Sequence, residues 1–363
     1  RTDTAHCPVI HHPPEPQYRL AETISLCART DLFETLSNER VSELSQLAGP
    51  GGFANAAAVL RSTGVSVRRI LQPDVQPVHL AMALEVALDQ QNLGRFEDFT
   101  SILLCHSHTD PTAAEQLASS LQQQARHPLP PVHAINAGCS GFLQQLQLAC
   151  HVPHNSRHSR TLLLNIETPE HWHCAADRAF CGLVSAAATA TIIDQQRGRP
   201  IHWLQTADIP VPDSHLLEPG PLFHTETTDS VTFRGAAQSR QIMRMHGEAV
   251  FVHAIELMLH AVKDAWQQLP PGSPVTLIPH QPSGKLLRTF AAALQSELPQ
   301  IEVLSNLEYS GNTISATIPE LLACLPPATA TQPAASHLIL AACGICMRRM
   351  HDHLSCGSAW IGL

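Results

Sequence analysis

The sequence predicts a layered α/β protein. Short apolar runs that suit buried strands alternate with longer segments in which apolar residues recur every three or four positions. Strands and helices that alternate in this way are typical of α/β layers. The chain has 363 residues, which is enough for about two units of roughly 150 residues each. Because the second part repeats the strand–helix rhythm of the first, we predict two similar halves, residues 1–200 and 201–363.

The first half is expected to open with a polar, proline-rich arm over residues 1–20. Its first periodic segment stops at Gly94, a usual C-cap residue type, and Pro111 suits the first turn of the next helix. The expected helices span 78–94, 111–126 and 139–151, and the expected strands span 101–106, 132–136, 161–167 and 182–194.

The second half is expected to follow a stretch of strands and loops, 195–235, that is rich in proline, aspartate, serine and threonine. The clearest helix pattern is 248–269, whose apolar residues fall on one face. The other expected helices span 283–298 and 313–325, and the expected strands span 274–280, 301–304, 337–344 and 358–363.

Composition narrows the class of function. The net charge is −9 with no block of lysine or arginine, which argues against a nucleic-acid surface. No run of about 18 apolar residues predicts a membrane span, and the first residues lack the profile of a secretory signal. The 11 cysteines are scattered without framework spacing, so we expect reduced thiols in a cytoplasmic protein.

Three histidine pairs with a spacing of two raise the question of a metal site. A spacing of two places both side chains on one face of a strand. The chain holds 23 histidines, so such pairs also arise by chance, and no acidic or cysteine partner completes a ligand set. We therefore expect no metal site. The pairs are His106/His108, His171/His173 and His351/His353.

Cys139 is the first candidate for chemistry. It follows the apolar run 132–136 and begins a predicted helix, with Gly138 and Gly141 on either side. The positive end of a helix dipole and its free N–H groups favour the thiolate, which is the reactive form of cysteine. We expect a reactive thiolate here, although a cysteine at such a junction is more often an inert filler.

His280 and Asn312 are the other two candidates. His280 ends a predicted strand in LIPHQPSGK, at the sheet edge where active-site groups of α/β proteins gather. Asn312 lies in the turn before a predicted helix, in YSGNTISATIPELL. Taken alone, His280 could satisfy a loop carbonyl, and Asn312 could serve the turn. Together with a cysteine, they suit thioester chemistry, in which imidazole and amide stabilise an enolate. A Cys–His–Asn protease would use the same residue types.

Five segments occur in the order of a known family: INAGCSGF, HGEAVFVHAIELM, LIPHQPSGKLL, YSGNTISATIPELL and LILAACG. They resemble the signature segments of beta-ketoacyl-acyl carrier protein synthase III, a branch of the thiolase superfamily. The resemblance covers about residues 130–344, and TGVSVRRI (63–70) more weakly resembles the family's arginine-bearing segment near the thioester entrance. It implies a thiolase-like, five-layered αβαβα fold built from two similar halves, and a homodimer.

The resemblance also implies roles for residues. Cys139 would be the acyl-accepting nucleophile, and His280 and Asn312 would polarise the carbonyl of a second thioester. The backbone N–H groups of Cys139 and Gly344 would form the oxyanion hole, where each donor is typically worth ~3 kcal/mol. No bound cofactor is implied, because coenzyme A or phosphopantetheine thioesters are the substrates.

Four basic residues match positions that meet phosphate of coenzyme A or of an acyl carrier protein in the family. They are Lys285 and Arg288, and more weakly Arg68 and Arg69. For all four, an ordinary solvated charge is the alternative.

The sequence also departs from the family pattern. LVSAAATATII replaces a Gly-Asp-Gly-Ala type stretch, and CGIC replaces a glycine run, which creates a Cys343–Cys346 pair that could also suggest a redox motif. Residues 347–356 are an extra stretch. Asp110 stands where the family often has an aromatic at the end of the acyl pocket, contributed across the dimer. A polar residue there argues against straight-chain fatty acyl groups and favours specialised metabolism.

Three hypotheses follow. The first is a decarboxylating Claisen condensation of an acyl-Cys139 with a malonyl or beta-keto thioester, in polyketide or fatty-acid-derived metabolite biosynthesis. The second keeps the acyl-Cys139 but transfers the acyl group to an oxygen or nitrogen nucleophile, which gives an ester or amide. The third is a silent subunit of a heterodimer, which the presence of Cys139, His280 and Asn312 disfavours.

Overall fold

The computed structural model describes residues 16–151, 159–178, 180–211, 222–325, 337–347 and 352–362. Most of the predicted arm, residues 1–15, and His351 of the third histidine pair lie outside these ranges. Among the residues described, no helix is both long and apolar enough to cross a membrane.

The core consists of two five-stranded sheets that join edge to edge through a short pairing of Arg19 and Leu20 with Arg199 and Pro200. The first sheet has the order β5-β4-β6-β7-β1, and the second has the order β12-β11-β13-β14-β8. The strands of the first are β1 (Arg19–Ser25), β4 (Ser101–Cys105), β5 (Val132–Ile135), β6 (Thr161–Glu167) and β7 (Ala187–Asp194). Those of the second are β8 (Arg199–Pro210), β11 (Val275–Pro279), β12 (Ile301–Val303), β13 (His337–Ile345) and β14 (His353–Ile361).

The two sheets repeat one topology. In each, the first strand along the chain forms one edge and the third forms the other, so that both read third-second-fourth-fifth-first. The second strand pairs in parallel with the third and fourth, and the fifth pairs antiparallel with its neighbours. The repeat changes at residues 195–198, between β7 and β8, which is close to the predicted boundary at 200.

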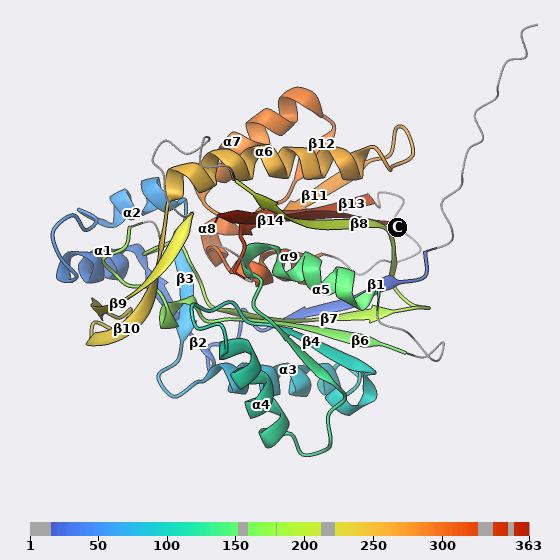
Figure 1. Cartoon of the computed structure of the whole chain (residues 1–363), viewed down its shortest axis with the longest axis horizontal. Coiled ribbons are helices and arrows are strands. Elements are labelled where there is room, and N and C mark those ends of the chain that lie inside the picture. Colours follow the sequence, from blue (N-terminus) through green and yellow to red (C-terminus); the bar gives the residue numbers. More distant parts are fainter. Residues whose placement is uncertain are drawn as a thin grey trace, which may run out of the picture.

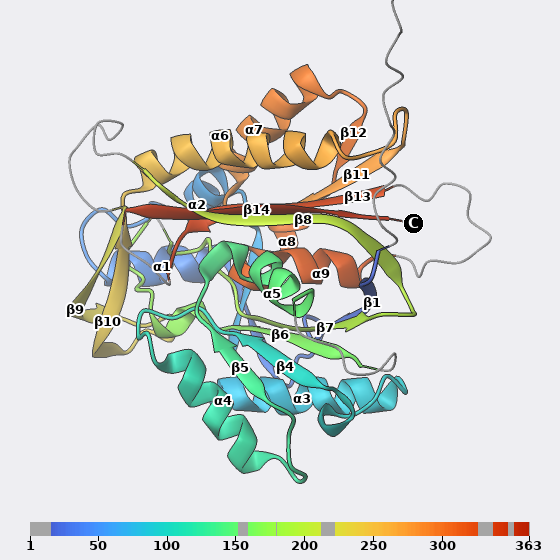
Figure 2. The same ribbon diagram turned by 45° about the vertical axis from the view of Figure 1, so that its right-hand side comes forward.

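Six helices complete the layers (Figures 1 and 2). α3 (Pro77–Gln90) and α4 (Ala113–Gln124) cover the outer face of the first sheet, and α6 (Gly247–Trp266) and α7 (Gly284–Glu297) cover that of the second. Between the sheets lie α5 (Gly141–Ala149) and α9 (Thr317–Ala323), each of which contacts strands of both sheets. This is the predicted thiolase-like αβαβα arrangement. The central helices are buried on nearly every side, because a sheet covers each of their two faces.

The remaining described elements gather beside these layers. They are β2 (Phe33–Ser37), α1 (Asn38–Leu47), α2 (Ala56–Thr63), β3 (Val67–Leu71), the hairpin β9 (Phe223–Val231) and β10 (Ala237–Met245), and α8 (Leu307–Ser310). Most of them are not specifically predicted by the sequence analysis, because they are short or polar. The hairpin shows why: its outer positions are polar and much of it is exposed, so the apolar alternation that marks a strand is weak.

Several predicted boundaries are wrong. The predicted strand 182–194 begins only at Ala187, because residues 182–186 form a turn and a single bridge of Val184 to Asn312. The predicted helix 313–325 starts as a 3-10 turn, Ile314–Ala316, before α9. The last strand, predicted as 358–363, begins at His353 because its polar first residues pair with β8 and β13 inside the sheet.

Candidate active site

One cavity of about 410 Å³ gathers residues from both halves of the chain. Cys139, Asn312 and Gly344 all line it. Exposed residues at its opening, here called the mouth, are Ser62, Arg178, Gly247 and Lys285. The interior wall is mostly apolar, which is usual for a pocket that binds a small organic group.

Cys139 lies in a 3-10 turn, Gly138–Ser140, between β5 and α5. Gly138 has a φ of +64°, a left-handed conformation that glycine adopts without cost. A Cβ on Gly141 would come within 2.6 Å of the Cys105 sulfur and 2.9 Å of the Ser315 Cβ. The glycines therefore allow the strand to turn sharply and present the cysteine at the head of a central helix.

The thiol of Cys139 is protonated in the folded chain near neutral pH. Burial, with a smaller contribution from Glu167, raises its pKa to about 12. This contradicts the expectation that the helix N-terminus lowers the pKa enough to ionise the sulfur. Removal from water disfavours the charged form, and the opposing contribution of the backbone N–H of Cys139 is smaller. The sulfur must therefore lose its proton as it reacts, which requires a base close by.

Gly344 packs directly against the cysteine. A Cβ built on Gly344 would lie 2.6 Å from the Cβ of Cys139 and 2.8 Å from its sulfur. Gly344 is near the end of β13, in a register opposite Ser355 of β14. Only glycine leaves room for the sulfur here, and it brings the backbone of residue 344 beside the position of an acyl carbonyl on Cys139.

His280 directly follows β11 and is fully buried. Its backbone N–H donates to the carbonyl oxygen of Ala341 at 2.7 Å. Neither ring nitrogen forms a hydrogen bond of normal geometry with a described residue. Burial lowers the pKa of His280 to about 3, against a smaller opposite contribution from the backbone of Ile314. The ring is therefore neutral, and both of its nitrogens remain available.

Asn312 is held rigidly. Its backbone N–H donates to Leu183 at 2.8 Å, and its carbonyl oxygen accepts from Ser185 at 2.9 Å. Its side-chain oxygen accepts from the N–H of Ile314 at 2.9 Å, and its Nδ2 donates to the carbonyl oxygen of Pro282 at 3.2 Å. The last contact ties Asn312 to the segment that carries His280. Because Nδ2 has two hydrogens, one is left to donate into the cavity.

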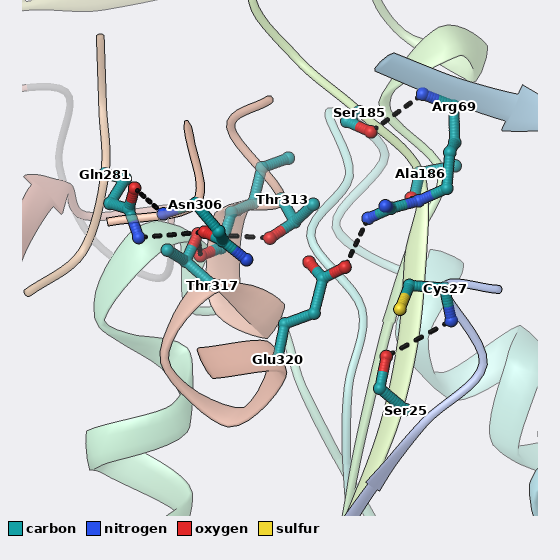
Figure 3. Close-up of polar contacts among 11 residues, drawn as sticks. Ser25, Cys27, Arg69, Ser185, Ala186, Gln281, Asn306, Thr313, Thr317 and Glu320 are labelled. Atoms are coloured by element: carbon teal, nitrogen blue, oxygen red, sulfur yellow. Dashed lines mark hydrogen bonds and ion pairs between the residues drawn. The ribbon is translucent and has the colours of Figure 1, made fainter. Parts of the chain in front are cut away.

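A buried polar network supports these residues (Figure 3). Gln281, next to His280, donates to Asn306 at 2.9 Å, and its oxygen accepts from the N–H groups of Asn306 and Leu307. Thr313, next to Asn312, donates to Thr317 at 3.2 Å. Both catalytic candidates are thus followed by a residue that is anchored in the protein interior.

Comparison with known proteins extends this geometry. Residues 134–207 match the family model of 3-oxoacyl-[acyl-carrier-protein (ACP)] synthase III. The beta-ketoacyl-[acyl-carrier-protein] synthase III of Rhodospirillum centenum is 27% identical over 269 residues, which cover 72% of this chain and 78% of that protein. The enzyme of the same name from Rickettsia massiliae is 25% identical, over 75% of this chain and 82% of that protein.

Solved structures agree with the fold. The priming beta-ketosynthase from the R1128 polyketide biosynthetic pathway superposes with a TM-score of 0.69 at 18% identity, covering 98% of this chain and 99% of that one. The 3-oxoacyl-(acyl carrier protein) synthase III of Pseudomonas aeruginosa gives a TM-score of 0.67 at 19% identity, over 96% and 99% of the two chains. The chain is synthase III-like in sequence and has the thiolase fold. Both the resemblance and the fold predicted from the sequence are confirmed.

Two basic residues of this synthase III-like chain do not face the cavity. Arg68 is 1% exposed, and its guanidinium donates to Leu36, Asn38 and Val65. Arg69 forms a buried ion pair with Glu320, with 2.6 Å between Nη2 and Oε1 (Figure 3). These internal partners contradict the prediction that the two arginines meet a substrate phosphate. Arg69 instead helps to position Asn312. Its backbone N–H donates to the hydroxyl of Ser185, and the N–H of Ser185 donates to the carbonyl oxygen of Asn312.

The other predicted binding residues lie nearer the surface. Lys285 is at the mouth, with its Nζ 5.2 Å from the centroid of the Phe251 ring. Arg288 is exposed one helical turn further along α7 and does not line the cavity. Asp110 does not line the cavity of its own chain. Its carboxylate accepts from the N–H and the hydroxyl of Thr112, both at 2.8 Å.

The sequence analysis missed three residues of the cavity wall: Trp172, His173 and Arg178. The sequence analysis considered His173 only as a possible metal ligand, in the pair with His171. Within the ranges described, no group of three or more His, Cys, Asp or Glu side chains is placed to hold a metal ion. Cys343 and Cys346 are both buried and form no disulfide bond within the described residues, and Cys343 instead lies opposite Cys356 on β14.

Proposed function

We propose that this chain is an acyltransferase of the ketosynthase III type, which loads an acyl group on Cys139 and condenses it with a malonyl or beta-keto thioester. The observation that carries the proposal is the packing of Gly344 against the Cys139 sulfur in a cavity that Asn312 also lines. The relatives named beta-ketoacyl-[acyl-carrier-protein] synthase III support the same reaction class.

In the first half-reaction, the sulfur of Cys139 attacks the carbonyl of an acyl thioester. The thiol proton passes to a neutral ring nitrogen of His280 as the carbon–sulfur bond forms, which the raised thiol pKa makes necessary. The N–H groups of Cys139 and Gly344 stabilise the oxyanion. When the old carbon–sulfur bond breaks, the leaving thiolate takes that proton, and His280 is neutral again.

In the second half-reaction, a malonyl thioester binds and loses carbon dioxide. The electron pair of the broken carbon–carbon bond forms an enolate, whose oxygen accepts hydrogen bonds from His280 and the free N–H of Asn312. The enolate carbon attacks the acyl-Cys139, the bond between the acyl carbon and the sulfur breaks, and the sulfur leaves as a thiolate that takes up one proton from water. The products are a beta-keto thioester and carbon dioxide. A neutral imidazole suits this role, because it donates a hydrogen bond without giving up its proton.

A second candidate function is transfer of the acyl group to an oxygen or nitrogen nucleophile. The observation in its favour is that His280 is neutral and that neither ring nitrogen has a hydrogen-bond partner of normal geometry among the described residues, so one nitrogen can accept a proton from an alcohol or amine. Carbon dioxide release separates the two functions, because only condensation with a malonyl thioester produces it.

The substrates are proposed to be thioesters of coenzyme A or of an acyl carrier protein, with no resident cofactor. Lys285 and Arg178 are the cations at the mouth and would meet phosphate there. We also propose a homodimer, in which Asp110 approaches the acyl pocket of the partner, and a role in polyketide or fatty-acid-derived metabolism. Light scattering of the purified chain tests the dimer.

Intact-protein mass spectrometry tests the central step. Incubation with a series of acyl-coenzyme A thioesters is expected to add one acyl mass to the wild type and none to Cys139→Ala. Cys105→Ala is the matched control, since Cys105 is buried beside Gly141 outside the cavity lining and should leave acylation intact. If no thioester adds mass, or if Cys139→Ala gains as much as the wild type, the proposal fails.

A further inference from the structure

Trp172 and His173 form a second polar feature of the cavity that holds Cys139. His173 is fully buried, and neither of its ring nitrogens has a partner among the described residues. Trp172 is 2% exposed, and its indole Nε1–H also has no acceptor in the described part of the chain. Both residues line the cavity. Folded proteins seldom leave buried polar atoms without partners, so three on one wall indicate a missing ligand group.

The wall that carries these atoms is firmly supported. The ring of His173 lies between those of Trp172 and Phe180, at centroid distances of 3.9 and 4.1 Å. Arg240 of β10 donates to the carbonyl oxygens of Glu170 and His173, and the N–H of Met243 donates to Trp172 at 3.3 Å. The hairpin β9–β10 therefore fixes this loop in place. Met243 also lines the cavity, and its flexible thioether can adjust to a bound group.

His173 and His280 are alike in their burial and in the missing partners of their ring nitrogens. Among the described histidines, only these two are fully buried with both ring nitrogens unpartnered. For His280 the missing partner is accounted for by the proposed thioester carbonyl. His280 is not among the residues that line the cavity of Cys139. His173 lines that cavity together with Cys139 and Asn312, and it is fully buried, whereas the residues of the mouth are exposed. Its missing partner therefore belongs to the part of the substrate that enters deepest, which is the acyl group and not the phosphate end.

The hydrogen-bonding capacity of the wall selects the chemistry of that partner. Burial and the charge of Arg240 hold the pKa of His173 well below its usual value, so the ring is neutral and offers one donor and one acceptor. Trp172 offers one donor. A hydroxyl can donate to the imidazole while it accepts from the indole, whereas a carboxylate only accepts and an alkyl chain does neither.

We propose that the acyl group that this chain loads on Cys139 bears a hydroxyl, which His173 and Trp172 recognise. This inference rests on the proposed acylation of Cys139 and adds the class of acyl group. The surrounding wall, formed by Phe180, Leu183, Val184 and Met243, is apolar, so the carbon skeleton of the acyl group packs there while the hydroxyl meets the two rings.

Paired coenzyme A thioesters test the proposal. Single-turnover acylation is followed by intact mass for 3-hydroxybutyryl- and butyryl-coenzyme A, for 4-hydroxybenzoyl- and benzoyl-coenzyme A, and for succinyl-coenzyme A. In at least one pair, the wild type is expected to react about tenfold or more faster with the hydroxylated member, because its analogue leaves the polar atoms unpaired. Trp172→Phe and His173→Phe are expected to abolish this preference, because the rate with the hydroxylated member falls more than the rate with the unsubstituted member. His173→Gln, which keeps a donor and an acceptor, is expected to retain part of it.

The outcomes are distinct. Acylation without preference in either pair, or a preference for succinyl-coenzyme A, overturns the hydroxyl assignment and leaves the proposed function standing. An equal loss of rate for both members of a pair in the variants assigns the two rings to the pantetheine arm or to stability, and also overturns it. No acylation by any thioester overturns both proposals. If His173→Phe does not fold, the wild-type ratio and Trp172→Phe still decide.

Discussion

The two halves of the molecule place a buried histidine at the same point of their repeat but use it differently. His106 follows β4, and His280 follows β11, the second strand of each sheet. Both are almost fully buried, and burial lowers the pKa of each, to about 4 and about 3. His106 uses Nδ1 in a 2.6 Å contact with the carbonyl oxygen of Ile166, whereas neither ring nitrogen of His280 forms a hydrogen bond of normal geometry with a residue in the described part of the chain. The first ring serves the fold, and the second is left for a ligand.

The same contrast holds at the next position of the repeat. After the third strand, the first half presents Cys139 at the head of α5, and the second half presents Asn312 before α9. Both reach one cavity, because α5 and α9 lie side by side in the central layer. The repeated fold thus supplies four equivalent positions around the centre of the molecule, and in the proposed mechanism three of them hold chemical groups while the fourth is structural.

Replacement of each of the two histidines by asparagine is the most direct test of the difference between them. His280→Asn is expected to lower kcat/KM by about 10²–10⁴, because it removes the proton acceptor and enolate donor, while stability changes little. His106→Asn is expected to keep kcat within about threefold but to lose about 1–3 kcal/mol of stability with its hydrogen bond. Steady-state kinetics and urea unfolding of both variants measure this. Equal losses of activity would show that the two sites are not distinct.

Gly344, near the end of the fourth strand of the second sheet, is expected to give the next largest effect. Gly344→Ala is expected to lower the rate of Cys139 acylation by about 10²–10³, because the new methyl group displaces the sulfur from the backbone donors. Gly357→Ala on β14 is the matched control, since its Cβ would meet Gln205 at 2.8 Å, and Thr206 at 2.9 Å, without reaching the sulfur. Both variants should lose comparable stability in thermal unfolding. A similar loss of acylation in the control would attribute the effect to the sheet.

The sequence predicts the inner strands of the sheets better than it predicts the elements at their edges. The buried strand Thr161–Glu167 was placed to the residue, because a continuous apolar run bounded by polar residues has few alternatives. Cys139, His280 and Asn312 could be recognised from motifs, yet the raised thiol pKa could not, because burial is a property of the folded chain. For the same reason, the sequence indicates a surface cation at Arg69. Its buried partner, Glu320, is 251 residues away in the chain and is identified only in the folded structure.

Glu167 ends β6, the fourth strand of the first sheet, and its carboxyl is buried with no cation paired to it among the described residues. Ser107 and Ser315 donate to it, but burial raises its pKa from 4.5 to about 8. The folded protein therefore holds this proton more tightly than the unfolded chain. Relative to Glu167→Gln, the wild type is expected to lose stability as pH rises from about 4.5 to 8, by on the order of a few kcal/mol, with no further relative change above. Urea unfolding at several pH values measures the difference, and a relative gain with pH would contradict the assignment.

The smallest expected effect concerns the mouth, where the second half contributes Lys285 and the first contributes Arg178. Lys285→Ala is expected to raise KM for acyl-coenzyme A about three- to tenfold with kcat unchanged, because an exposed cation in high dielectric gives a modest attraction to phosphate. Arg288→Ala, one turn further along α7 and outside the cavity, should change KM less than about twofold. Raising the salt concentration should shrink the first effect, since screening weakens exposed charge pairs. If Arg288→Ala has the larger effect, the phosphate passes along α7 instead of over the mouth, and the role predicted for Lys285 is wrong.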